Sequence, residues 1–202
     1  MKKLFFLAIM AGMLFFGCSQ DSSDFNPVAP STELTKTSEE TSPFISWPKN
    51  DDISLSKIIY SRTEWISPYK SERIYINHGY WSNGSYIRIK MTLKFDRGSV
   101  DHYIKASASL DTDEGTFEFL PSPITFNKPL TLDFEISGLT GDDLEKFKEV
   151  KKFVCFNENG EMEEMSFDKL GVVEHEFWGR KFGTFVLENC KIPHFSLYGF
   201  AR

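Results

Sequence analysis

Cysteine is scarce in this chain, with only Cys18, Cys155 and Cys190 among 202 residues. So few cysteines exclude the disulfide-dense scaffolds of small secreted domains. They also lack the Cys/His spacing of a zinc site, so we expect no metal and no other cofactor. Cys155 and Cys190 lie in apolar segments that are typical of strands. They either form a disulfide or stay as two separate buried thiols, and the sequence leaves both alternatives open.

Positive charge is also in short supply. Lysine and arginine number 23 against 29 aspartates and glutamates, which gives a net charge of −6, and no basic cluster is present. Removal of residues 1–17, expected for the reason given next, takes away two lysines and leaves a charge of about −8. A surface of this sign argues against nucleic acid and anionic lipid as partners.

Long apolar runs are missing except near the start of the chain. After two lysines, the uncharged run Leu4–Phe16 suits the core of a signal peptide and is too short for the roughly 20 residues of a membrane-spanning helix. The run ends in Gly17-Cys18, which resembles the lipobox of bacterial lipoproteins. The resemblance implies a signal peptide over residues 1–17, cleavage before Cys18, and lipid on the Cys18 thiol. We therefore expect a lipid-anchored protein of the bacterial cell envelope, at the outer membrane if the organism has one.

The segment that follows lacks periodic apolar residues. Residues 18–43 are rich in Ser, Thr, Glu and Pro, a composition that cannot offset the entropy lost on ordering. We predict a disordered linker over 18–43, between the lipid-bearing Cys18 and a folded domain over 44–202.

Alternating apolar and polar residues dominate that domain. The alternation is clearest in Tyr86–Phe95 and Leu130–Ile136. Ser82-Asn83-Gly84-Ser85 predicts a tight turn to a partner strand over 73–80. From Thr140 to Val150 the apolar residues instead follow helical spacing, which predicts a short helix crossing between sheets. Other strands are expected at 54–61, 102–110, 116–120, 152–157, 171–177, 183–189 and 195–201. The fold class predicted is all-β, a β-sandwich with one short helix.

Residues 79–202 resemble the ZU-five domain, a β-sandwich of zona occludens proteins, netrin receptors and ankyrins. The matching segments are IRIKMTLKFDRG at 87–98, GTFEFLPSPITFNKPLTL at 115–132, FVCFNENG at 153–160 and PHFSLY at 193–198. The resemblance implies a module that binds other proteins. Residues 97–100 depart from the family pattern, and residues 44–78 lie outside the resemblance.

The resemblance also implies one candidate for chemistry. Some ZU-five domains cut themselves at a His-Phe-Ser tripeptide, here His194-Phe195-Ser196. Ser196 would attack the Phe195 carbonyl and His194 would serve as base, with backbone strain as the driving force. The simpler interpretation, which we favour, is that this segment belongs to the last strand.

Two acidic segments invite a metal or catalytic interpretation. Asp111-Thr112-Asp113-Glu114-Gly115 departs from a calcium loop because glycine comes one position early, and a hairpin turn explains the same residues. In a strand, Glu174 and Glu176 share one face and His175 takes the other, so the three cannot converge on one metal. We expect a turn and solvated charges, and we interpret the acidic Glu161, Glu163 and Glu164, which also invite a metal or paired-carboxylate interpretation, as solvated charges too.

Tryptophans and tyrosines in the domain raise a carbohydrate-binding hypothesis, since exposed aromatic faces stack on sugar rings. The candidates for ligand stacking are Trp65, Trp81 and Trp178, with Trp81 beside the predicted turn as the first to test. The alternative is that these rings pack in or around the core.

These expectations together predict a non-enzymatic module, anchored to a membrane through its N-terminal lipid, that binds another envelope or extracellular protein or has a structural role. A glycan-binding module is the second hypothesis. A domain that cuts itself between Phe195 and Ser196 is the third.

Overall fold

The computed structural model describes residues 43–51, 59–156 and 161–202. The chain divides into two units, Met1–Glu39 and Glu40–Arg202, and every described residue belongs to the second. The predicted signal peptide, Cys18 and all but the last residue of the predicted linker lie outside the described residues.

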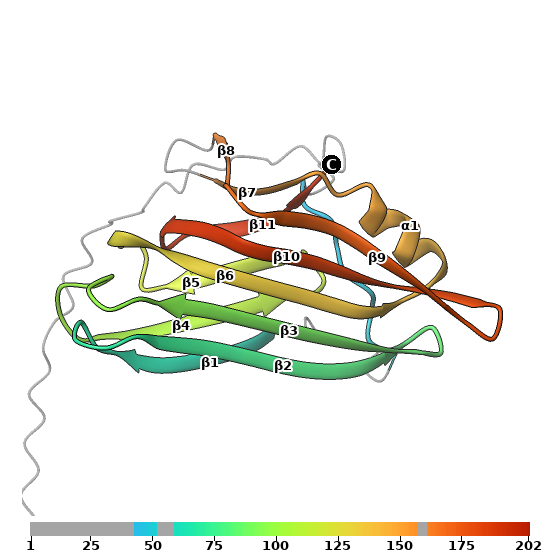
Figure 1. The fold of residues 1–202 in the computed structure, drawn as a ribbon, viewed down its shortest axis with the longest axis horizontal. Coiled ribbons are helices and arrows are strands. Elements are labelled where there is room, and N and C mark those ends of the chain that lie inside the picture. The colour runs from blue at the N-terminus through green and yellow to red at the C-terminus, as the bar shows by residue number, and fades with distance from the viewer. Residues whose placement is uncertain (1–42, 52–58, 157–160) are drawn as a thin grey trace, which may run out of the picture. The chain divides into compact units, whose positions relative to one another are not determined.

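The described part of the chain is a sandwich of two antiparallel sheets and one helix, as predicted (Figure 1). Six strands pair in the order β1-β4-β5-β11-β7-β8 and five in the order β2-β3-β6-β10-β9. The strands are β1 Ile59–Ile66, β2 Glu72–Ser82, β3 Ser85–Phe95, β4 Ile104–Asp111, β5 Thr116–Leu120, β6 Thr125–Leu139, β7 Lys152–Phe156, β8 Met162–Glu164, β9 Lys169–Phe177, β10 Arg180–His194 and β11 Leu197–Ala201.

Strand β3 shows why the alternating pattern produces a sandwich. Its residues Ile87, Ile89, Met91 and Leu93 are buried, and they lie beside the buried face of β6. The intervening polar residues point to the outer face, where Lys90 pairs with Glu135 at 2.8 Å. Aliphatic side chains and many phenylalanine rings fill the space between the sheets, and the rings make edge-on and tilted contacts with centroids about 5 Å apart.

Helix α1, Gly141–Lys148, connects β6 of one sheet to β7 of the other, so it crosses between sheets as predicted. Leu144 and Phe147 are buried on its inner face, and the Phe147 ring lies 5.0 Å from that of Phe185. Thr140 precedes the helix but does not cap it with its side chain; its hydroxyl instead shares a hydrogen bond with Ser85. Within the described residues, no helix has the length and apolar character needed to cross a membrane.

Two strands are longer than the alternation predicts. β6 and β10 each have 15 residues, and β10 passes through three shifts in register against β6. Such bulges let a long strand stay paired while it twists. The last strand begins at Leu197 and not at residue 195, so Phe195 and Ser196 belong to the connection between the sheets, which corrects the predicted strand 195–201. Part of the predicted strand 54–61 lies outside the described residues.

Candidate functional site

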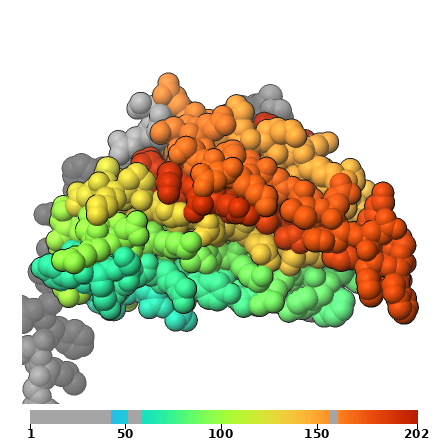
Figure 2. Space-filling view, in the orientation of Figure 1, coloured from blue at the N-terminus to red at the C-terminus, as the bar shows by residue number. Residues whose placement is uncertain are grey.

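Two hairpin turns lie at the same end of the five-stranded sheet. Residue pairing is antiparallel from β2 through β3, β6 and β10 to β9. This places the β2–β3 turn, Asn83-Gly84, and the β9–β10 turn, Trp178-Gly179, at a common end (Figure 1). The β9–β10 hairpin projects there, as Figure 2 also shows.

Large aromatic side chains are exposed on both hairpins. Trp81 and Tyr86 are each 52% exposed, Phe177 is 65% exposed and Trp178 is 91% exposed. We call these four residues the aromatic end. The structure therefore brings two of the predicted stacking residues, Trp81 and Trp178, to one end of one sheet, and it adds two rings that sequence reasoning did not select.

Trp81 and Tyr86 form a pair across the β2–β3 hairpin. Their rings meet edge-on, with centroids 5.5 Å apart and planes at 66°. The Tyr86 ring crosses the β2 backbone over Gly79, where any side chain on residue 79 would collide with the end of the tyrosine. Gly79 thus provides the space in which Tyr86 lies.

Phe177 and Trp178 form the second pair. Their rings stack with centroids 5.6 Å apart and planes 16° apart. Because Phe177 pairs with Arg180, only Trp178 and Gly179 form the turn. Both have positive φ, 51° and 70°, as a type I′ turn requires.

Tryptophan is an unfavourable residue for the first position of that turn. The left-handed conformation costs an L-residue with a Cβ about 1–2 kcal/mol, and Asn and Gly tolerate it best. The β2–β3 turn has the same geometry with the preferred residues, Asn83 at φ 49° and Gly84 at φ 74°. At position 178 the chain therefore carries a bulky side chain that costs stability and is left almost wholly in solvent.

Trp65 is not part of this surface. It lies near the end of β1, and a short connection leads from there to the first residue of β2, which is the opposite end of the five-stranded sheet. Nearby in the chain Tyr69 is exposed, and its ring contacts that of Tyr103 at 6.1 Å. The three predicted stacking tryptophans thus do not form a single site.

The segment His194-Phe195-Ser196 is held by hydrogen bonds at each residue. The Phe195 N–H donates to Ile124 O at 2.8 Å, and the Ser122 hydroxyl donates to Phe195 O at 3.0 Å. The Ser196 hydroxyl donates to Phe156 O at 3.1 Å, so its proton is held by a backbone carbonyl. None of the three residues is among the described non-glycine residues with positive φ. These contacts favour a packed connection over a strained scissile peptide.

The two acidic segments have the structural roles expected of them. In the turn between β4 and β5, Asp111 Oδ1 accepts the N–H groups of Asp113 and Glu114, both at 3.1 Å. On β9, Glu174 lies 3.0 Å from Lys148 of α1, and the His175 ring stacks on Phe182.

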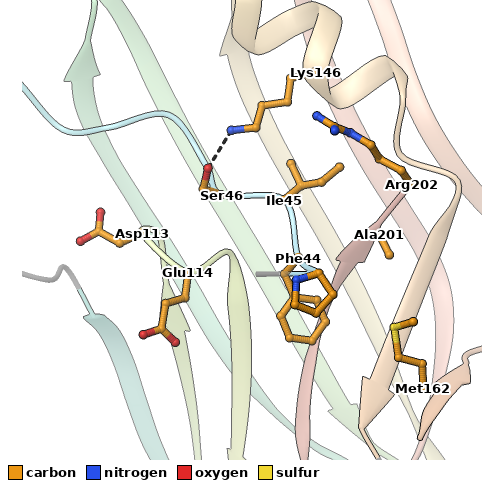
Figure 3. A pocket seen from close by; sticks show the side chains of 10 residues that line it. Phe44, Ile45, Ser46, Asp113, Glu114, Lys146, Met162, Ala201 and Arg202 are labelled. Atoms are coloured by element: carbon orange, nitrogen blue, oxygen red, sulfur yellow. Dashed lines mark hydrogen bonds between the residues drawn. The ribbon is translucent and has the colours of Figure 1, made fainter. Parts of the chain in front are cut away.

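A pocket of about 540 Å³ lies where the described chain enters the sandwich (Figure 3). Lys146 of α1 donates to Ser46 Oγ at 2.8 Å, and partial burial lowers the pKa of this lysine. Asp113 and Glu114 lie on the other side of the pocket from Lys146 and Arg202. No sequence signal marks this pocket, because a turn, a helix and the chain end assemble it.

Cys155 and Cys190 are free thiols, both fully buried, on β7 of one sheet and β10 of the other. In the structure the two cysteines are therefore separate buried thiols, and no disulfide joins them. Burial raises the pKa of Cys155 to about 11 and that of Cys190 to about 12, so both stay protonated at neutral pH. Cys155 also lies beside Glu163 and His194, a grouping that the sequence analysis missed.

No protein-family model matches this chain, and no curated protein sequence or solved structure matches it either.

Proposed function

We propose that this protein is a membrane-anchored, non-enzymatic binding module whose partner is another protein of the cell envelope, and that the aromatic end is its recognition surface. The observation that carries the proposal is Trp178. A tryptophan that is 91% exposed, at positive φ, in a turn better served by asparagine, lowers stability and adds nothing to the core. An exposed side chain that is kept at this cost in backbone strain indicates that Trp178 contacts another molecule.

The aromatic end has the composition of a protein interface. Tryptophan and tyrosine are enriched among the residues that contribute most to binding between proteins. Each of its two ring pairs is already in contact, which reduces the side-chain entropy lost on association. Charged residues on the same hairpin, Glu176, Arg180 and Lys181, are exposed and supply a polar rim.

The predicted anchor agrees with a module that meets its partner at a membrane. Lipid on Cys18 would hold the chain at the surface, since two or three acyl chains bind firmly where one is marginal. A flexible linker over 18–43 would extend roughly 25–30 Å r.m.s.. The ZU-five resemblance, in which the domain binds proteins, supports the same class of function.

The partner surface is tested by photo-crosslinking in the producing cells. A photoreactive residue at position 178 should give one discrete adduct. The same residue at the exposed position 103, which contacts Tyr69 in the β1–β2 connection at the opposite end of the sandwich, should not. Equal labelling from both positions would contradict the assignment of the surface. The anchor is tested separately: labelled palmitate should enter the wild-type chain and be absent from Cys18→Ala.

A glycan is the second candidate ligand, favoured by the flat Tyr86 ring over Gly79 with Trp81 beside it. If the protein binds a glycan, Trp81→Ala abolishes that binding and position 178 gives no protein adduct, the ligand is a glycan and not a protein. Self-cleavage between Phe195 and Ser196 is the third. A denatured intact mass that includes residues 196–202 excludes it.

A further inference from the structure

Three metal-ligating side chains converge at the edge of the sandwich, at the end of the five-stranded sheet opposite the aromatic end. The Sγ of Cys155, a carboxylate oxygen of Glu163 and a ring nitrogen of His194 all lie within 4.8 Å of one another. They come from β7, β8 and the last residue of β10, so both sheets contribute.

Strand pairing explains why these residues meet. Cys155 and Glu163 are directly opposite in the β7–β8 ladder, so their side chains lie on the same face. That face is the inner one, because Cys155 belongs to the core. β8 is the edge strand, which leaves Glu163 exposed while Cys155 is buried. His194 completes the group from the facing sheet, where it pairs with Thr125 at the start of β6.

The His194 side chain is positioned by its neighbours. Tyr198 pairs with Cys155 on the side away from Glu163, and its ring centroid lies 6.1 Å from that of His194. The Tyr198 hydroxyl donates to His194 O at 2.6 Å. The strand end that carries the imidazole is therefore attached to the sheet that carries the thiol and the carboxylate.

We infer that Cys155, Glu163 and His194 form a binding site for a zinc-like divalent cation. Thiolate, imidazole and carboxylate are the three donor types that zinc takes in proteins. A tetrahedral zinc ion with bonds of about 2.0–2.3 Å spaces its ligand atoms about 3.5 Å apart, so small side-chain movements close the observed group around it. Three protein ligands leave one position for water or an external donor.

Binding has a defined proton balance. The Cys155 thiol loses its proton to solvent as sulfur takes the metal, His194 binds as neutral imidazole, and Glu163 binds as carboxylate. The site carries two negative ligand charges against the two positive charges of the ion. The buried sulfur therefore becomes charged only together with the cation that neutralises it.

Cobalt(II) is the probe, because a thiolate bound to cobalt gives a charge-transfer absorption that oxygen and nitrogen ligands do not. The full chain, untagged, reduced and carrying Cys18→Ala, is titrated so that Cys155 and Cys190 are its only thiols. One cobalt per chain with a charge-transfer band, displaced by zinc, is the expected result. No band, or more than one equivalent needed to produce it, overturns the inference.

Matched variants locate the site. Cys155→Ala should abolish the band and Cys190→Ala, at the second buried thiol, should keep it; the reverse pattern overturns the inference. Glu163→Gln and His194→Gln should weaken cobalt binding at least about tenfold, since even second-shell changes cost 10–100-fold. Glu164→Gln, next in sequence and paired with Lys152 at 3.3 Å, should leave it unchanged. If Cys155→Ala does not fold, unchanged affinity in both Glu163→Gln and His194→Gln overturns the site.

Discussion

Replacing Trp178 by asparagine should stabilise the protein while it weakens partner binding. The substitution gives the β9–β10 turn the Asn-Gly pair that the β2–β3 turn already has at Asn83-Gly84. Relief of the left-handed tryptophan is worth about 1–2 kcal/mol. The lost stack on Phe177 costs about 0.5 kcal/mol, the low end for ring pairs, because both rings are exposed.

The expected net gain is about 1 kcal/mol in the free energy of unfolding, which for a domain of this size raises Tm by about 2–4 °C. Urea denaturation and thermal melts of wild type and variant measure it. Crosslinking from position 81 in the same variant measures the loss of partner binding.

The reciprocal change is the control. Asn83→Trp puts tryptophan into the other turn and should lower the free energy of unfolding by about 1 kcal/mol. If Trp178→Asn is destabilising, or Asn83→Trp is neutral, the left-handed turn is not the source of the cost and the reasoning about Trp178 fails.

Three further outcomes are expected. Gly79→Ala should push the Tyr86 ring off β2 and reduce partner crosslinking, while stability in urea changes by no more than about 0.5 kcal/mol, since the flexible end of the tyrosine moves. Phe117→Ala, which removes a core ring packed on Trp47, Phe134, Phe153 and Phe200, should cost about 3–5 kcal/mol in urea denaturation. Partial desolvation by the Tyr60 ring, 3.9 Å away, lowers the pKa of His78 below 6.5, so the unfolded chain binds its proton first on acidification. The free energy of unfolding should therefore fall as pH drops below about 6.5, and His78→Gln should flatten that part of the curve.

Local patterns predicted the elements well where one face of a strand is buried. Ile87, Ile89 and Met91 alternate with polar residues, and only a strand places all three in the core. Asn83-Gly84 specified its turn because few residue pairs accept positive φ. Trp178-Gly179 forms the same type of turn without an Asn-Gly pair. The sequence therefore predicted a connection between strands 171–177 and 183–189 but not the type of turn. The bulges of β10 were missed because an extra residue interrupts the alternation.

The sequence by itself determined the all-β class, most strands, the crossing helix, and the prediction of a lipid on Cys18. Each depends on residues near one another in the chain. Only the tertiary structure decided which strands pair, and hence that Trp81 shares an end with Trp178 and not with Trp65. It likewise set Cys155 beside Glu163 and His194, with the two cysteines free on different sheets. Pairing between distant strands depends on packing of the whole core, which no local pattern encodes.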